Sequence, residues 1–376
     1  MQSKINIIHI AEDISPVSGG VATVVKMLTS ELKNDLINHE VVCNFASDAS
    51  LPKHVKIKKF NPSKYDLGWG YSHQLNEYLR KKSLEPETIF HIHGVWKFIH
   101  YFAARLASQN NTPSLITLHG MMDPFLWNKQ GLFKKIKKDL YWKITSKTFN
   151  KLKKVHAITN SEAENLKNRF SNMNITLIPN SMKIENNDVA TIDDGAEKYF
   201  LFIGRIAMQK GLDILIKSYV ASYLDTRFKL KIIGPIEDIN LWNKIKKVIN
   251  QHESIEYLGT KFGKEKDDLI SNAWACVVSS RMEAIGMVNL EAANLRCPSI
   301  TTYQTGLHDW EEGGGILIDA ESVNSCKQAL IDSSCWTLEE RITRGQKSYN
   351  LVKKRYNIAV TNNLWLSLYS SLKNKR

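Results

Sequence analysis

Two basic residues and two glycines stand close together where a predicted strand gives way to a helix. Gly204 and Arg205 follow the apolar run 199–203, and Lys210 and Gly211 open the next helical pattern. Two cations and free helix N–H groups can hold a diphosphate by charge and by hydrogen bonds. An exposed loop with ordinary basic side chains is the alternative, because the chain has 51 Lys and Arg residues.

A second loop, Ser18-Gly19-Gly20, lies between the first apolar run and the first helical pattern. Glycine lets the backbone come close to a ligand, and the N-terminus of the following helix favours a phosphate. A plain tight turn would fit the same residues. The loop lacks the G-x-G-x-x-G pattern of dinucleotide-binding proteins, so the sequence disfavours NAD binding.

A third segment adds two carboxylates. Glu283 is expected in the loop after the strand 275–278, Gly286 at the start of a helix, and Glu291 about one and a half turns into it. Carboxylates beside a phosphate site are unfavourable unless they bind sugar hydroxyls, whereas amides near Gly286 and Met287 would face an anion. A solvated helix residue and an ordinary loop acid remain the alternative.

Two more loops end predicted strands with histidine and glycine. His91 and His93 precede Gly94, and His119 precedes Gly120. The pattern is typical of residues that line a cleft, although structural histidines fit it equally well. No acid or cysteine accompanies them at the spacing of a third ligand, so a metal site is not expected.

The composition excludes a disordered chain, a collagen and a coiled-coil rod. Among 376 residues, 43% are hydrophobic and 24% charged, which is ordinary globular usage. Lys and Arg exceed Asp and Glu by 13, which points to an anionic partner: a nucleic acid, a membrane surface or a phosphorylated substrate. The cysteines form no C-x-x-C pair, which favours a reducing compartment; they are Cys43, Cys276, Cys297, Cys326 and Cys335. The first apolar run is too short for a signal peptide, and no run approaches the ~20 residues of a membrane helix. We therefore expect a cytosolic protein, or one peripheral to the membrane on its cytosolic side.

Short apolar runs alternate with helical patterns along nearly the whole chain. This alternation predicts parallel β-α-β units and an α/β fold. In the first half the predicted strands are 5–11, 40–45, 88–93, 114–118, 155–159 and 176–178. In the second half they are 199–203, 229–233, 255–258, 275–278, 299–301 and 316–318. The polar, acidic stretch 181–198 between them is interpreted as a linker, and two such sheets would bind ligands in a cleft at their carboxyl strand ends.

These pieces, in this order, resemble glycosyltransferase family 4, whose members have the GT-B fold: two Rossmann-like domains facing across a cleft. The most specific match is the pair Glu283 and Glu291, eight positions apart as in the family. Gly204-Arg205 with Lys210-Gly211, Ser18-Gly19-Gly20, His119-Gly120 and Ile178-Pro179-Asn180 match further family motifs. The resemblance covers nearly the whole chain.

The resemblance implies a domain organisation and a reaction. Residues 1–180 would form the acceptor domain, 181–198 a linker, 199–355 the nucleotide-sugar donor domain, and 356–376 a helix returning to the first domain. Family members transfer a hexosyl or N-acetylhexosaminyl unit from a nucleotide sugar with retention of configuration and without a protein nucleophile. A saccharide acceptor linked to a lipid diphosphate is expected, in bacterial surface polysaccharide assembly such as O-antigen of lipopolysaccharide, capsule or exopolysaccharide.

The resemblance also implies roles for individual residues. Arg205 and Lys210 would neutralise the departing diphosphate, so no metal and no cofactor are expected. Glu283 would hold hydroxyls of the transferred sugar, Glu291 the ribose, and His119 would face the donor sugar. The remaining donor-binding residues are Gly19, Gly20, Gly286, Met287 and Val288.

The sequence departs from the family pattern in three places. Ala284-Ile285 replaces the usual Gly-Phe, and Ser181-Met182-Lys183 replaces Gly-Val-Asp. The loop Thr305-Gly306-Leu307-His308-Asp309-Trp310 differs where the family contacts the donor sugar, so the donor identity transfers least well; a UDP-sugar is favoured over GDP-mannose. A nucleotide-sugar epimerase, a phosphorylase and a transferase to a small soluble acceptor share this architecture. A non-catalytic nucleic-acid binder is suggested by charge alone, and the chain lacks its motifs.

The segment 129–154 is strongly basic. It contains ten lysines and the single acid Asp139, and Phe133, Ile136, Leu140 and Ile144 recur within it at three- and four-residue spacing. A basic amphipathic helix of this kind is typical of membrane-surface binding. The alternative is a helix whose apolar stripe faces the core and whose lysines are merely solvated.

Overall fold

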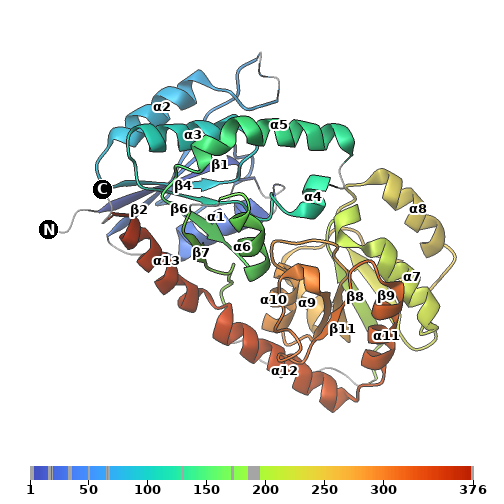
Figure 1. Ribbon diagram of the computed structural model, residues 1–376. Helices are drawn as coiled ribbons and strands as arrows, with labels where there is room; N and C mark the ends of the chain where they lie inside the picture. The colour runs from blue at the N-terminus through green and yellow to red at the C-terminus, as the bar shows by residue number, and fades with distance from the viewer. Residues whose placement is uncertain are drawn as a thin grey trace. The chain divides into compact units, whose positions relative to one another are not determined.

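The computed structural model describes residues 4–15, 18, 20–32, 36–49, 51–64, 66, 68–128, 131–170, 173–184 and 195–373. The chain forms two compact units. The first contains residues 1–180 and 361–376, and the second contains residues 181–360 (Figure 1). Each unit is built around its own parallel β-sheet and hydrophobic core.

In the described part of the first unit, seven parallel strands lie in the order β3-β2-β1-β4-β5-β6-β7. Their bounds are β1 Ile5–Asp13, β2 Ile37–Phe45, β3 Lys56–Lys59, β4 Thr88–His93, β5 Ser114–Thr117, β6 Lys154–Ala157 and β7 Ile175–Leu177. Every residue of β4 is buried, as expected for a central strand covered by helices on both faces.

Helices cover both faces of this sheet. They are α1 Gly20–Glu31, α2 His73–Leu84, α3 Phe98–Gln109, α4 Pro124–Asn128, α5 Leu132–Phe149, α6 Asn160–Lys167 and α13 Ile358–Lys373. Apolar residues of α2, α3, α5 and α6 form one core cluster, and those of α1 and α13 form another. The carboxyl-terminal helix thus belongs to the core of the first unit through Trp365, Leu368, Tyr369 and Leu372.

The second unit repeats this design. Within residues 195–360, six parallel strands lie in the order β10-β9-β8-β11-β12-β13. They are β8 Tyr199–Ile203, β9 Lys229–Ile233, β10 Ile255–Tyr257, β11 Ala275–Val278, β12 Ser299–Thr302 and β13 Ile316–Ile318. The helices are α7 Leu212–Ser222, α8 Ile239–Ile249, α9 Gly263–Ser271, α10 Met287–Asn294, α11 Val323–Ser334 and α12 Leu338–Arg355, with short 3₁₀ turns at Met208–Lys210 and Tyr303–Thr305.

All twelve predicted strands are present, with bounds that differ by a few residues, and the α/β fold class is confirmed. The sequence analysis missed β3, Lys56–Lys59, because all four of its residues are exposed and give no apolar run. Most of the predicted linker, residues 185–194, lies outside the described residues. The cysteines form no disulfide, although Cys276 and Cys297 lie with their sulfur atoms 3.8 Å apart. No helix in the described part of the chain is long and apolar enough to span a membrane.

Candidate functional site

Lys210 and Glu283 form an ion pair in the second unit. The Lys210 Nζ atom lies 3.0 Å from Glu283 Oε1, and the Ser280 hydroxyl donates a hydrogen bond of 2.6 Å to the same oxygen. The two charged side chains are only 18% and 11% exposed. A cation in the 3₁₀ turn that follows β8 and a carboxylate after β11 therefore share one partly enclosed position at the carboxyl edge of the sheet.

The backbone of Gly211 makes this pairing possible. Gly211 has φ +67°, and a Cβ atom there would lie 1.9 Å from the carbonyl oxygen of Ser279. The Ser279 hydroxyl donates back to the carbonyls of Gly211 and Lys210, at 3.0 and 3.2 Å. Only glycine allows this approach, which brings the turn after β8 against the end of β11.

Arg281 stabilises the turn that carries Lys210. Its guanidinium binds both carboxylate oxygens of Asp213 at 2.8 Å, donates to the Met208 carbonyl at 2.7 Å, and lies 3.2 Å from Glu321. Burial alone would raise the pKa of Asp213, but the Arg281 guanidinium outweighs burial and lowers it. Arg281 thus clamps the 3₁₀ turn that carries Lys210.

Arg205 does not share this position. Its guanidinium forms a close ion pair with Glu237, in the connection after β9, and both side chains are about half exposed. The pairing places Arg205 on the β9 side of the loop. Only one nitrogen of the guanidinium pairs with Glu237, so its other N–H groups could still donate to a phosphate.

Helix α10 presents the second glutamate. Glu291 lies on this helix, and its Oε2 is 3.1 Å from Nζ of Lys266 on α9. The N–H groups of Gly286 and Met287 donate to the carbonyls of Thr305 and Ile285, at 3.0 and 2.9 Å. These two amides would therefore have to change partners to bind an anion, and Val288 follows them in the first turn of α10.

The divergent loop after β12 is held from within. Leu307 and Trp310 are fully buried, and the Trp310 indole donates to Ser299 Oγ at 2.9 Å. Asp309 forms an ion pair with Arg355 of α12. These contacts fix the loop that differs most from the family pattern.

In the first unit, His119 follows β5 in the left-handed region, with φ +51°. Such a conformation is uncommon for a residue other than glycine. The next amide, Gly120 N–H, donates to Glu162 Oε1 at 2.7 Å, and Ile158 N–H donates to Glu162 Oε2 at 2.8 Å. Burial raises the pKa of the Glu162 carboxyl, which the two amides partly offset. Glu162 therefore joins the loops after β5 and β6 behind His119.

Sequence analysis missed Glu162 and Lys266. Glu162 stands three residues after Thr159, whose side chain accepts its N–H at 3.2 Å, so the sequence indicates only a helix cap. Lys266 is one of many lysines and meets Glu291 only through the packing of α9 beside α10.

The first glycine loop is only partly described. Gly19 lies outside the described residues, and Ser18 donates its hydroxyl to the carbonyls of Ser15 and Asp13. Gly20 begins α1, and no atom of the described residues lies within 4 Å of where its Cβ would be. Packing therefore does not require glycine at this position.

Among the described residues, one group has metal-ligand spacing: His9, His91 and His93. Its ring nitrogens already have partners. His9 and His93 bond each other at 3.0 Å, and His91 contacts the Tyr369 and Thr117 hydroxyls, both at 2.8 Å. The arrangement is that of a hydrogen-bonded network.

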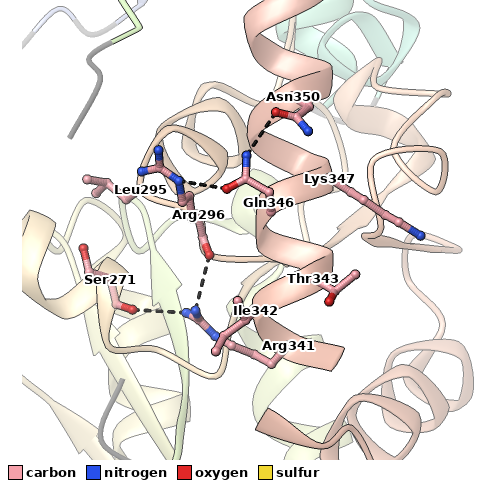
Figure 2. Close-up of a pocket in the computed structure, with 9 residues that line it drawn as sticks. All are labelled: Ser271, Leu295, Arg296, Arg341, Ile342, Thr343, Gln346, Lys347 and Asn350. Carbon is pink, nitrogen blue, oxygen red and sulfur yellow. Dashed lines mark hydrogen bonds between the residues drawn. The ribbon is translucent and has the colours of Figure 1, made fainter. Parts of the chain in front are cut away.

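A pocket of about 340 Å³ lies beside α12 (Figure 2). The predicted site residues do not line it. Its buried cation, Arg341, donates to the backbone carbonyls of Ser271, Ala273 and Arg296, at 3.1, 2.7 and 3.3 Å, and so ties α12 to neighbouring loops. The Arg296 Nε–H donates to Gln346 at 3.1 Å. We assign this pocket a structural role.

Comparison with known proteins identifies the family. A model of the family described as Glycosyltransferase Family 4 matches residues 18–186, and one described as Glycosyl transferases group 1 matches residues 197–333. An uncharacterized glycosyltransferase of Methanocaldococcus jannaschii is 29% identical over 330 residues, which cover 84% of this chain and 85% of the relative. A poly(glycerol-phosphate) alpha-glucosyltransferase of Bacillus subtilis is 29% identical over 150 residues, 38% of this chain and 22% of that protein.

Solved structures match over both units. Sucrose-phosphate synthase from Thermosynechococcus elongatus has a TM-score of 0.73 at 16% identity, covering 99% of this chain and 100% of that one. Anabaena HepE in complex with UDP and glucose has a TM-score of 0.72 at 12% identity, covering 98% and 100%. The fold is therefore GT-B. The chain belongs to the family 4 glycosyltransferases, as its motifs predict.

Proposed function

We propose that this enzyme transfers a hexosyl or N-acetylhexosaminyl unit, with retention, from a nucleotide sugar to a lipid-linked saccharide. The Lys210–Glu283 ion pair is the observation that carries the proposal. The proposal assigns the diphosphate to Lys210 and the sugar hydroxyls to Glu283, and the two side chains are 3.0 Å apart. Such a pair suits a nucleotide sugar, in which a single bond joins the diphosphate to the sugar.

In the proposed reaction, the acceptor oxygen forms a bond to the anomeric carbon while the bond from that carbon to the diphosphate oxygen breaks. The acceptor proton passes to an oxygen of the departing phosphate, on the same face of the sugar. Lys210 and Arg205 stabilise the negative charge that develops, usually the largest catalytic contribution. Glu283 and His119 contact the sugar, Glu291 the ribose, and Gly20 and Val288 lie by the donor. The proposal includes no metal and no further cofactor.

We favour a UDP-hexose as donor. Anabaena HepE, which shares the fold, was crystallised with UDP-glucose, and the Bacillus relative is named as a glucosyltransferase acting on a poly(glycerol-phosphate). The polymer in the latter name agrees with a polymeric acceptor, and we propose O-antigen, capsule or exopolysaccharide assembly as the pathway. Transfer to a small soluble acceptor is the alternative.

Helix α5 supports a membrane-linked acceptor. The alternative interpretation required its apolar stripe to face the core. It does not, because the side chains of the stripe are 85%, 53%, 57% and 66% exposed; they are Phe133, Ile136, Leu140 and Ile144. The opposite face packs inward through Thr145 and Phe149, which are buried. A contiguous apolar stripe that is exposed on a protein surface often marks an interaction site.

Lysines surround this stripe, which favours an anionic lipid surface as the partner. Lys134, Lys137, Lys143 and Lys147 lie on the same helix and are exposed. Each cation near an anionic leaflet adds roughly 1 kcal/mol to binding. We therefore propose that α5 rests peripherally on the inner face of the cytoplasmic membrane, close to the lipid-linked acceptor.

A donor and acceptor panel tests the proposal. The purified enzyme is incubated with individual UDP- and GDP-sugars and with total lipid-linked saccharide, and nucleotide diphosphate release is measured with and without EDTA. We expect acceptor-dependent release from a UDP-hexose or UDP-N-acetylhexosamine that survives EDTA. Turnover of GDP-mannose alone would contradict the donor assignment, and loss with EDTA that magnesium restores would contradict the metal-free mechanism.

A further inference from the structure

A row of four histidines crosses the first sheet. It runs from His39 on β2 through His9 on β1 and His93 on β4 to His119 after β5, along neighbouring strands. Nδ1 of His39 lies 3.0 Å from Nε2 of His9, Nδ1 of His9 lies 3.0 Å from Nε2 of His93, and Nδ1 of His93 lies 3.1 Å from Nε2 of His119. Adjacent rings are stacked with centroids 5.2–5.3 Å apart. Every link thus joins Nδ1 of one ring to Nε2 of the next.

The far end of the row has a fixed polarity. Nε2 of His39 lies 3.2 Å from the carbonyl oxygen of Leu32, just beyond α1. A carbonyl oxygen can only accept, so the proton of His39 is on Nε2 and its Nδ1 is an acceptor. Burial keeps the rings neutral, because it lowers the pKa of His39 to about 4, that of His119 to about 3, and those of His9 and His93 well below the usual value.

This polarity passes from ring to ring. A neutral imidazole has one N–H and one lone pair. His9 must therefore donate from Nε2 to His39, which leaves its Nδ1 to accept from Nε2–H of His93. His93 in turn accepts from Nε2–H of His119. All four rings have the same tautomer, and the last lone pair is on Nδ1 of His119, for which the described part of the chain offers no partner.

We propose that His39, His9 and His93 are positioning residues that fix the tautomer of His119, so that its Nδ1 can only accept a hydrogen bond and selects a donor sugar with a hydroxyl there. The selection of a sugar rests on the proposed function, whereas the tautomer does not. A carbonyl or carboxylate at that place would face a lone pair and be rejected, because its oxygen could not be satisfied.

A second series of hydrogen-bonded side chains on the same sheet provides an internal control. Nε2 of His156 donates to the Ile178 carbonyl at 2.8 Å, and Nδ1 accepts from the Thr117 hydroxyl at 2.9 Å. Thr117 in turn contacts Nε2 of His91, which meets the Tyr369 hydroxyl through Nδ1, both at 2.8 Å. In this second series, too, each neutral imidazole donates from Nε2 and accepts at Nδ1. The series ends on α13, and among the described residues it makes no hydrogen bond to His119.

Long-range ¹H–¹⁵N NMR of the full chain, labelled in histidine, tests the tautomers directly. We expect His119, His93, His9 and His39 to be neutral and protonated on Nε2 at pH 7.5. A proton on Nδ1 of His119, or a stoichiometric metal ion held by the row, would overturn the inference. Either result can be read whether or not glycosyl transfer is found.

Two substitutions at the His39 end of the row sharpen the test. His39→Phe keeps a stacked ring but removes the acceptor for His9, so the row can reverse and place the His119 proton on Nδ1. His39→Gln keeps an amide oxygen for His9 and an N–H for Leu32, and so preserves the polarity. We expect His39→Phe to switch the His119 tautomer and lower kcat/KM for the donor about tenfold, with His39→Gln close to wild type and His156→Phe unchanged in the His119 tautomer.

The His119 tautomer and kcat/KM for the donor must change together. A His39→Phe protein that loses activity while His119 stays protonated on Nε2 would show that the loss is structural and would overturn the proposal. Monodeoxy donor analogues add a second check: His39→Phe should have no further effect on the one analogue that lacks the hydroxyl bound by His119. An equal loss with every analogue would also count against it.

Discussion

The ammonium group of Lys210 lies 3.0 Å from the carboxylate of Glu283, so two side chains with different expected ligands form one ion pair. A diphosphate that binds Lys210 must compete with Glu283 for the cation. The carboxylate is retained close by through the Ser280 hydroxyl, at 2.6 Å, and is then available to sugar hydroxyls. With the proposed roles, the pair would couple the binding of the diphosphate to the binding of the sugar.

Lys210→Met should lower kcat by about 10²–10³, the usual effect of losing one preorganised charge at a developing anion. The change leaves the fold intact, because Arg281 and Gly211 hold the turn independently of the Lys210 side chain. Initial rates with the preferred donor measure the change in kcat. Lys266→Met, which removes the partner of Glu291, is the matched control and should mainly change the donor KM. Nearly unchanged kcat in Lys210→Met would refute the assigned role.

Glu291→Ala and Glu283→Ala should separate binding from catalysis. Glu291 pairs with Lys266 of α9. In the proposed role, its loss would remove a ribose contact that is equal in the ground and transition states. Glu291→Ala should therefore raise the donor KM with little effect on kcat, whereas Glu283→Ala should depress kcat because the sugar is mispositioned. Steady-state kinetics of both variants give the comparison, and wild-type behaviour in both would disprove the assignment.

Gly20→Ala and Gly211→Ala should have opposite consequences. Gly20 has no described atom within 4 Å of a new Cβ, so alanine should leave the urea midpoint unchanged or raise it slightly. If phosphates approach this backbone, the donor KM should nevertheless rise. Gly211→Ala should cost more than about 2 kcal/mol, since the new Cβ meets the Ser279 carbonyl at a positive φ. A Gly20→Ala enzyme with an unchanged donor KM would remove this loop from the donor site.

The sequence predicts strands far better than it predicts which helix faces are buried. Strands such as Tyr199–Ile203 and Ala275–Val278 are short buried apolar runs with clear ends, and their bounds match the structure. On α5 the apolar stripe is exposed, while Tyr141, Thr145 and Phe149 face inward. Both sets have helical spacing, so periodicity alone could not decide between them.

The candidate site shows the same limit. The spacing of the two glutamates and of Lys210 predicts a motif, but the residues that they contact lie far away along the chain. Glu162 reaches Gly120 across 42 residues, and the row from His39 to His119 depends on strand order in the sheet. Contacts of this kind follow from packing, which a single sequence does not encode in any local pattern.

The first unit should lose stability in mild acid. The folded-state pKa values of His39 and His156 are about 4, against 6.5 for the unfolded chain, so between these values the unfolded chain binds more protons. The free energy of unfolding therefore falls as the pH drops through this window, by about 1 kcal/mol for each histidine from pH 6.5 to 5.5. Glu162, whose pKa is raised, opposes the trend.

Urea unfolding at pH 7.5, 6.5 and 5.5 measures this dependence. His156→Phe should flatten it, whereas His73→Gln, at an exposed position on α2, is the matched control and should not. A free energy of unfolding that is constant over this range would mean that the buried histidines are not held neutral.

Helix α5 should bind anionic membranes through both its apolar stripe and its lysines. In flotation experiments, we expect the protein to bind vesicles that contain phosphatidylglycerol at low salt, to bind less at high salt, and not to bind neutral vesicles. Replacing Phe133, Ile136, Leu140 and Ile144 by serine should abolish binding without unfolding, because these side chains are exposed. Lys134, Lys137, Lys143 and Lys147 changed to Glu should have the same effect.

The matched control is a second basic helix on the other unit. Changing Lys244, Lys246 and Lys247 of α8 to Glu lowers the net charge by 6, as would any three of the four α5 lysines. Helix α8 has no comparable apolar stripe, since Ile239 is its only exposed large hydrophobic residue among those described. If the α5 and α8 variants lose binding equally, net charge alone drives the association and α5 is not a docking surface. If only the α5 variants lose binding, and lose transfer to lipid-linked acceptor while retaining hydrolysis of the free nucleotide sugar, the helix brings the enzyme to its acceptor.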